Sequence, residues 1–249
     1  MKITQDTVIS NEKIAKDTYQ MVLQPEEMPV ILAGQFVNIK IDGLLLRRPI
    51  SICSIDETTY MIIYKVVGEG TKKLSEMAVG TTLDVLKPLG SFFPIHEELD
   101  EVLLIGGGVG IPPLYEVAKQ YRKRNKRVAV VLGFNDMESK FYDIEFRQLG
   151  CSIYVATMDG TSGIKGTVMD CIRQYDLKIE YIYSCGPLRM LEAINQNYSK
   201  GYLSFEARMA CGMGACMGCV CKDSKDKELY YRICKEGPVF EVGKVDMGC

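Results

Sequence analysis

The sequence has no tryptophan and a single histidine, His96, among its 249 residues. This scarcity excludes a multi-histidine metal site and leaves little for a histidine-based triad. No apolar run reaches the length of a membrane span, and residues 1–6 lack the apolar core of a signal peptide. The net charge of −2 leaves no basic surface for nucleic acid. We therefore expect a cytoplasmic protein, without a membrane or nucleic-acid partner, whose redox chemistry comes from bound cofactors rather than from catalytic side chains.

Four of the ten cysteines are spaced like metal ligands. Cys211, Cys216 and Cys219 follow the pattern C-x4-C-x2-C, and Cys234 comes after fourteen further residues. Plant-type ferredoxins use this spacing to hold a [2Fe–2S] cluster. The residues between the first three cysteines are mostly small, as a tight loop around a cluster requires. Without a signal segment, so many cysteines also indicate thiols kept reduced for metal binding.

Other uses of these cysteines are weaker fits. Structural zinc usually takes two separated pairs, and a disulfide framework suits a secreted chain. Cys221 lies two residues after Cys219, and spacing alone does not say which of the two is the ligand, although the ferredoxin pattern favours Cys219. Four more cysteines are expected to be buried structural thiols or incidental: Cys53, Cys151, Cys171 and Cys249.

Residues 1–97 alternate polar and apolar side chains in short runs, which predicts a small antiparallel β-barrel. One helix is predicted over residues 71–78, with Thr71 as its N-cap. Two segments of the barrel are suited to a diphosphate. The first begins with Arg48, whose guanidinium is a forked donor. The second is the glycine-rich turn at residues 68–71, because a helix N-terminus offers backbone N–H groups.

Residues 98–200 alternate strands and helices, which predicts an α/β domain with a parallel sheet. The apolar run 102–105 leads into a glycine-rich turn and then a helix, an arrangement that places a nucleotide at the carboxyl edge of the sheet. Further strands are predicted at 127–133, 151–156 and 181–184, and further helices at 142–149, 167–175 and 188–197. Residues 133–138 are acidic where a 2′-phosphate would need arginine, so we predict NAD rather than NADP.

These motifs resemble the ferredoxin–NADP reductase superfamily. Its R-x-Y-[ST] motif matches residues 48–51, except that Ile50 replaces the tyrosine, and its G-G-x-G-I-x-P and C-G-P motifs are also present. The resemblance implies that FAD is bound by Arg48, Pro49, Ile50, Ser51, Tyr64, Lys65, Val66, Gly70 and Thr71. It implies that NAD is bound by Gly106, Gly107, Gly108, Gly110, Cys185, Gly186 and Pro187.

The order of barrel, nucleotide domain and cysteine segment (201–249) resembles the electron-transfer subunits of class 1B dihydroorotate dehydrogenases. The most specific parts are residues 48–52, 208–221 and 234–240. The resemblance implies a route from a dihydroorotate-oxidising FMN subunit through the [2Fe–2S] cluster and FAD to NAD⁺, in de novo pyrimidine synthesis, within a heterotetramer of two plus two subunits. The 43 residues after Glu206 are too few for a complete ferredoxin domain, so we expect them to lean on the flavin domain or a partner.

Two other functions stay open. One is the flavin and iron–sulfur subunit of a ferredoxin- or sulfide-linked NADPH oxidoreductase, although the cluster segment lacks the aspartate ligand of those relatives. The other is a zinc-stabilised binding module on a degenerate reductase fold, which predicts a colourless protein.

Overall fold

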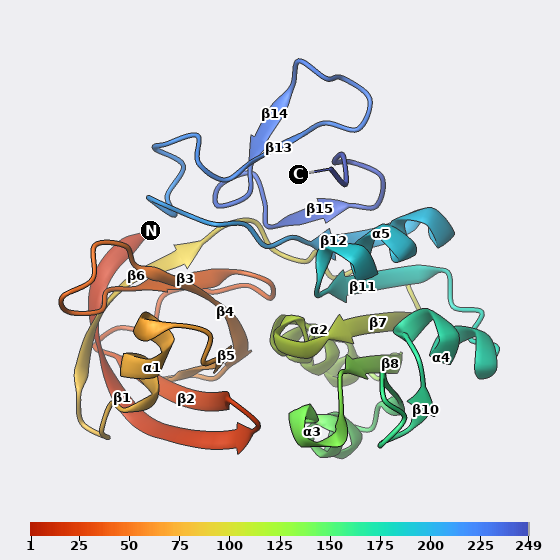
Figure 1. Cartoon of the computed structure of the whole chain (residues 1–249), viewed down its shortest axis with the longest axis horizontal. Coiled ribbons are helices and arrows are strands. Elements are labelled where there is room, and N and C mark those ends of the chain that lie inside the picture. The colour runs from red at the N-terminus through yellow and green to blue at the C-terminus, as the bar shows by residue number, and fades with distance from the viewer. Residues whose placement is uncertain (249) are drawn as a thin grey trace.

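The computed structural model describes residues 1–248; Cys249 lies outside the described residues. Figure 1 shows a barrel on the left, a sheet with helices on the right, and the C-terminal segment above both. The predicted fold class is confirmed.

The N-terminal part is a closed antiparallel barrel with the strand order β1-β2-β5-β4-β3-β6. Its interior is mostly apolar, because alternate residues of each strand point inward and most of these are apolar. The strands are β1 (Lys2–Ala15), β2 (Thr18–Pro25), β3 (Phe36–Ile39), β4 (Arg48–Ile55), β5 (Tyr60–Lys65) and β6 (Thr82–Leu89).

The helix inside the barrel sequence begins earlier than predicted. Helix α1 spans Glu69–Ser75, its N-cap is Gly68, and Thr71 occupies the third helical position. The Thr71 hydroxyl accepts hydrogen bonds from the backbone N–H groups of Val67 and Gly68, at 2.9 and 3.2 Å. The assignment of Thr71 as N-cap is therefore wrong, and the reason is physical: its hydroxyl serves the turn before the helix.

The second part is a seven-stranded sheet with the order β10-β9-β8-β7-β11-β12-β15. Its first six strands run parallel: β7 (Glu101–Gly107), β8 (Arg127–Phe134), β9 (Ser152–Thr157), β10 (Ile164–Lys165), β11 (Tyr181–Cys185) and β12 (Lys200–Ser204). The helices are η1 (Gly108–Gly110), α2 (Pro112–Lys123), η2 (Met137–Ser139), α3 (Asp143–Gln148), α4 (Val168–Gln174) and α5 (Leu188–Asn197).

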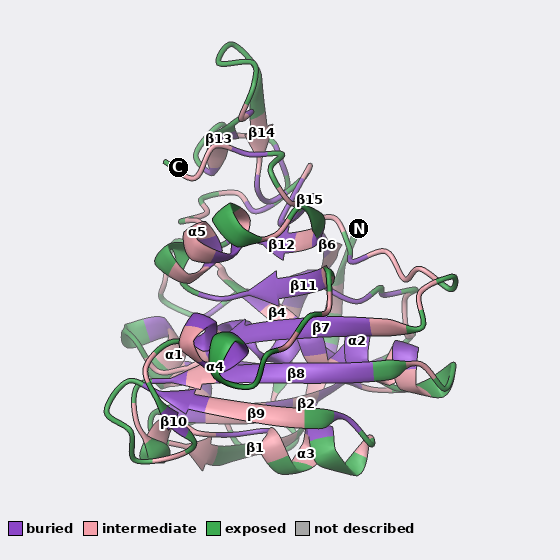
Figure 2. Cartoon of the chain, turned by 90° about the vertical axis from the view of Figure 1, so that its right-hand side faces the viewer, coloured by how far each residue is buried: buried purple, intermediate pink, exposed green. Residues whose placement is uncertain are grey.

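Both faces of this sheet are covered, as Figure 2 shows for the buried central strands β7 and β8. Val102 and Leu104 of β7 pack in the core that contains residues of α2, whereas Leu103 and Ile105 pack in the core that contains residues of α4 and α5. A parallel strand buried on both faces reads as a continuous apolar run. The apolar run 102–105 predicts such a buried parallel strand, and the core packing confirms it.

The C-terminal segment extends the sheet of the α/β part. Strand β15 (Val239–Glu241) pairs antiparallel with β12, while β13 (Val220–Lys222) and β14 (Tyr230–Arg232) form a separate hairpin. The expected division at residues 97 and 200 stays a prediction; β12, which begins at Lys200, belongs to the parallel sheet. Among residues 1–248, no helix is long and apolar enough to cross a membrane.

A fully buried ion pair lies inside the barrel. Lys87 of β6 donates to the Asp6 carboxylate of β1, and both side chains are inaccessible to solvent. Tyr60 of β5 donates to the same carboxylate at 2.5 Å, and the Lys87 ammonium lies 4.6 Å from the centre of its ring. Since an unpaired charge in such a place is strongly destabilising, the three groups depend on one another.

We predict that Lys87→Met lowers the free energy of unfolding by about 3–5 kcal/mol, because Asp6 would be left buried without its counter-ion. Denaturant titration followed by tyrosine fluorescence measures this. The control is Lys178→Met, which removes an exposed pair with Asp176 and should change the stability by less than about 1 kcal/mol. Equal effects of the two substitutions would show that the buried pair is not important for the barrel.

Candidate functional site

A cavity of about 300 Å³ opens on the barrel, where the barrel faces the α/β part. Six of the nine residues predicted to bind FAD line it: Pro49, Ile50, Ser51, Tyr64, Lys65 and Thr71. Ile50 supplies an apolar wall in place of the tyrosine of the superfamily motif. The orientation of the Tyr64 side chain is fixed, because its hydroxyl donates to the Asn11 side chain at 2.8 Å. The cavity therefore has the apolar walls and few polar groups that are typical of a cofactor site.

Arg48 and Gly70 are in direct contact at the N-terminus of α1. A Cβ atom added at Gly70 would overlap the Arg48 guanidinium, so a side chain there would displace it. Arg48 also donates to the backbone carbonyl of Leu46. The structure thus brings together the two features predicted to bind the flavin diphosphate, an arginine and a helix N-terminus. Arg48, Val66 and Gly70 are not among the residues that line the cavity itself.

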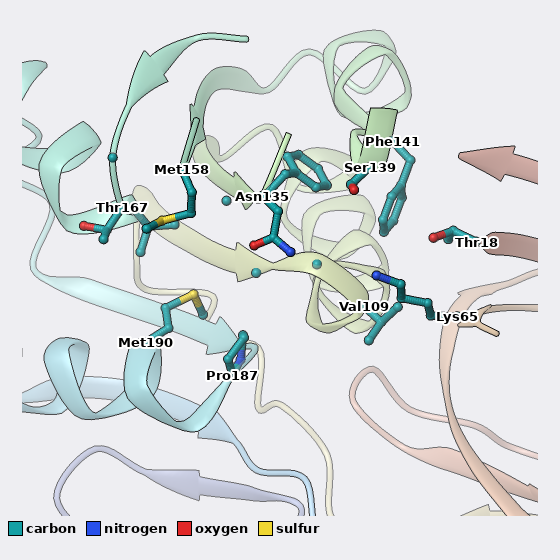
Figure 3. A pocket seen from close by; sticks show the side chains of 16 residues that line it. Thr18, Lys65, Val109, Asn135, Ser139, Phe141, Met158, Thr167, Pro187 and Met190 are labelled. Atoms are coloured by element: carbon teal, nitrogen blue, oxygen red, sulfur yellow. The ribbon is translucent and has the colours of Figure 1, made fainter. Parts of the chain in front are cut away.

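A second cavity of about 240 Å³ lies at the carboxyl ends of β7, β8 and β9, with Lys65 and Thr18 facing it from the barrel (Figure 3). Of the residues predicted to bind NAD, Gly107, Gly108 and Pro187 line it. This is the position where open parallel sheets bind nucleotides. Lys65 and Val109 line both cavities, so the two sites adjoin.

The remaining predicted NAD residues act in packing rather than in lining the cavity. A side chain at Gly110 would collide with the carbonyl of Cys185, and one at Gly106 would approach Ile111 to 2.7 Å. Cys185 is only 2% exposed, and burial raises the pKa of its thiol well above the usual range. A side chain added at Gly186 would likewise overlap Met190. These residues shape the turn that holds the nucleotide site.

The four predicted cluster ligands fall into two pairs. The Sγ atoms of Cys211 and Cys216 are 3.3 Å apart, and the backbone N–H of Cys234 donates to Cys219 Sγ at 3.4 Å. Within residues 1–248, no three His, Cys, Asp or Glu side chains gather as a site for a single metal ion. A [2Fe–2S] cluster takes two thiolates on each iron, and these two pairs can supply them.

Backbone N–H groups point at the sulfur atoms of this site. Gly214 donates to Cys234 Sγ at 3.2 Å, and Cys216 donates to Cys211 Sγ at 3.4 Å. Burial opposes ionisation of Cys211, but hydrogen bonds from the backbone of Cys216, Met213 and Ala215 outweigh it and lower the pKa of the thiol to about 6. Burial raises the pKa of Cys234 to about 12. Bound metal would supply the positive charge that keeps this buried thiolate ionised.

The structure separates the two cysteines that spacing left open. Cys221 belongs to strand β13, pairs with Tyr231 in the hairpin, and its thiol donates to the Tyr231 carbonyl at 3.7 Å. Its side chain is 2% exposed and part of the hydrophobic core. Cys219, in contrast, accepts from the backbone N–H of Cys234. This geometry favours Cys219 as the third ligand.

Sequence reasoning missed a large part of the flavin cavity wall. Its unpredicted residues come from β3 and β5, from the turns after β5 and β7, from the segment between β12 and the cysteines, and from the position before β15: Phe36, Ile63, Val67, Val109, Phe205, Glu206, Ala207, Met209 and Pro238. Loss of solvent raises the pKa of the Glu206 carboxyl. No local motif signals residues 205–207, Met209 and Pro238, because they reach the cavity only through the docking of the C-terminal segment.

A barrel with a flavin cavity, an adjoining nucleotide cavity and a paired four-thiol site define an electron-transfer flavoprotein of the ferredoxin reductase class. Residues 206–246 match the family described as the iron–sulfur cluster binding domain of dihydroorotate dehydrogenase B. The dihydroorotate dehydrogenase B (NAD(+)) electron transfer subunit of Fusobacterium nucleatum subsp. nucleatum is 46% identical, over 99% of this chain and 100% of the relative. That of Bacillus mycoides is 44% identical, over 97% and 98%. The chain belongs to the family of dihydroorotate dehydrogenase B (NAD(+)) electron transfer subunits.

Solved structures of other reductases share the fold. A structure of an NADH-dependent reduced ferredoxin–NADP oxidoreductase has a TM-score of 0.85 at 27% identity, covering 97% of this chain and 90% of its own. Phthalate dioxygenase reductase has a TM-score of 0.68 at 17% identity, covering 99% and 96%, and shares the fold.

We predict that Arg48→Ala and Gly70→Ala each lower the FAD content of the purified chain, and that the double variant is no worse than the stronger single one. Gly70→Ala displaces the same guanidinium that Arg48→Ala removes, so the two effects should not add. The flavin absorbance per chain measures the content. The control is Arg173→Ala on α4, which removes an arginine that pairs with Asp170 and lines neither cavity. Additive losses would argue against a shared diphosphate site.

We predict that Cys219→Ser loses most of the about two irons expected per chain, whereas Cys221→Ser keeps them. The two positions are matched in burial, but only Cys219 lies among the paired thiols. Iron and sulfide analysis, with EPR of the reduced protein, measures the result. Loss of the cluster in Cys221→Ser but not in Cys219→Ser would reverse the ligand assignment.

Proposed function

We propose that this chain passes electrons from a dihydroorotate-oxidising FMN subunit, through a [2Fe–2S] cluster and FAD, to NAD⁺. The family assignment gives an electron-transfer subunit of an NAD⁺-type oxidoreductase, and such a subunit implies a catalytic partner. The FMN of that partner, a complex of two plus two subunits, a cytoplasmic location and a role in pyrimidine synthesis are the finer parts of the proposal. They rest on the family resemblance.

The observation that carries the proposal is the order of the three sites. The nucleotide cavity adjoins the flavin cavity through Lys65 and Val109. The flavin cavity is also lined by residues 205–207 and Met209, and Met209 is two positions before the first predicted cluster ligand, Cys211. A flavin held there would lie between the nicotinamide and the cluster.

The chain supplies binding and orientation, while the cofactors supply the redox chemistry. When bound, FAD exchanges one or two electrons, so it can link a one-electron cluster to a two-electron nicotinamide. Arg48 and the N-terminus of α1 would bind the negatively charged diphosphate of FAD. The apolar Ile50 and Phe205 exclude water from the flavin cavity. His96 lines neither cavity; it stacks on Tyr202 and hydrogen-bonds to Glu98, so it has a structural role.

The spectrum of the purified chain tests the proposal. Under anaerobic conditions, NADH should bleach the flavin bands and produce a rhombic EPR signal of a reduced [2Fe–2S] cluster. Dihydroorotate should produce the same changes only after the catalytic subunit is added. A colourless zinc protein would refute the proposal. Reduction by ferredoxin or sulfide, and not by dihydroorotate with the catalytic subunit, would favour the alternative of a ferredoxin- or sulfide-linked oxidoreductase.

We predict a KM for NADH at least about tenfold below that for NADPH, a difference of about 1.4 kcal/mol in binding. Asn135 and Ser139 line the nucleotide cavity, and the Asp136 carboxylate between them accepts from the Ser139 N–H and hydroxyl, both at 2.8 Å. These bonds lower the pKa of Asp136, so it stays charged and would repel a 2′-phosphate.

Lys16, the cation near Asp136, already pairs with the Glu138 carboxylate at 3.0 Å, so its charge is balanced. The double variant Asp136→Ser/Glu138→Gln removes both carboxylates, so it should narrow the preference for NADH over NADPH. Steady-state reduction of an artificial electron acceptor, with each nucleotide varied in turn, measures both values. A wild-type preference for NADPH would contradict this specificity.

A further inference from the structure

Arg232 connects the two segments that carry the predicted cluster ligands. It is the last residue of β14 and lies two positions before Cys234. Its Nη1 atom donates to the carbonyl of Gly214 at 2.6 Å, and Gly214 lies in the loop between Cys211 and Cys216. The bond therefore joins the cysteine loop to the strand that leads to the fourth ligand.

The guanidinium is held in this position by Glu236. Its Nη2 and Nε atoms donate to the two carboxylate oxygens at 2.5 and 3.1 Å, and the backbone N–H of Arg232 donates to the same group at 2.8 Å. Such a bidentate pair fixes the orientation of the guanidinium plane, which a lysine could not reproduce. The guanidinium is linked to a predicted ligand sulfur through a single residue, since it donates to the Gly214 carbonyl and the Gly214 N–H donates to Cys234 Sγ.

Gly214 is fixed at both of its backbone polar groups. Its N–H donates to Cys234 Sγ at 3.2 Å, while its carbonyl accepts from Arg232. With a φ of +79°, it also has a backbone conformation that favours glycine. Movement of Arg232 would therefore release one of the N–H···S bonds of the site. Such bonds and nearby charge are among the factors that set the potential of an iron–sulfur cluster.

We propose that Arg232 is a positioning residue that holds the cysteine loop closed through Gly214 and whose charge raises the reduction potential of the cluster. The inference rests on the proposed function, because it requires a [2Fe–2S] cluster on the four cysteines. Reduction adds a negative charge to the cluster, and a nearby guanidinium stabilises that charge. Neutralising Arg232 alone leaves the Glu236 carboxylate beside the site, which should disfavour reduction further.

Three variants of the holoprotein separate the charge of Arg232 from its bond to Gly214. Arg232→Gln removes both. Arg232→Lys keeps the charge but loses the planar guanidinium that binds Gly214 and Glu236. Arg232→Gln/Glu236→Gln also loses the guanidinium but keeps the net charge. The control is Arg173→Gln on α4, which breaks a similar pair, with Asp170 at 2.5 Å, far from β13 and β14 (Figure 1).

The first measurement is an EPR-monitored redox titration, and the second is the rate at which a chelator removes iron. Arg232→Gln should disfavour reduction about tenfold, which is a potential about 59 mV lower for one electron. The lysine and double variants should keep a potential near that of the wild type. All three should lose iron several-fold faster than the wild type, and Arg173→Gln should match the wild type in both measurements.

The outcomes are distinct. An unchanged potential in Arg232→Gln, or an equal loss of potential in Arg232→Lys, overturns the charge argument. Unchanged iron loss in the lysine and double variants overturns the role of the Gly214 bond. If Arg232→Gln assembles no cluster, the lysine and double variants carry the test. A wild-type chain without the rhombic signal would instead refute the proposed function itself.

Discussion

The structure depends on one junction, residues 237–239, where barrel, sheet and cysteine segment meet. The backbone N–H of Ser91, just after the barrel, donates to the Gly237 carbonyl at 2.6 Å, and the Ser91 hydroxyl bonds both polar groups of the Val239 backbone. Phe205, just after β12, donates to the Pro238 carbonyl at 2.9 Å. Pro238 also lines the flavin cavity. A single tripeptide thus links all three parts beside the proposed flavin site.

A second contact fixes the barrel against the sheet. The buried Glu116 of α2 accepts from the backbone N–H of Ile55 at 3.0 Å, and Lys119 of the same helix donates to the Ser54 hydroxyl and the Ile55 carbonyl. Glu116 and Lys119 also pair with each other at 3.2 Å. Because buried polar groups are costly when unpaired, these contacts resist sliding of the two parts. The adjoining flavin and nucleotide cavities therefore keep one relative position.

The sequence predicts best where the cause of structure is local. The helix at residues 188–197 and the cysteine spacing were predictable, because periodicity and ligand geometry operate over a few residues. The predicted N-cap of α1, Thr71, was wrong by three residues. A hydroxyl near a helix start can either cap the helix or bind the turn that precedes it. The pairing of β15 with β12 was not predictable. It joins strands more than thirty residues apart across the whole cysteine segment, and no local pattern encodes such a pairing.

Residues 201–248 of the cysteine segment pack into a core shared with the rest of the chain, and this explains how the cluster site is connected to the flavin site. Cys219, Cys221 and Cys234 pack in the same apolar cluster as Leu203 of the sheet and Leu89 of the barrel. A segment of this size buries too little surface to be stable alone. Its folding energy comes from the surfaces that also build the flavin cavity. Folding of the cysteine segment is therefore coupled to its packing against the barrel and sheet, which links the cluster site to the flavin site.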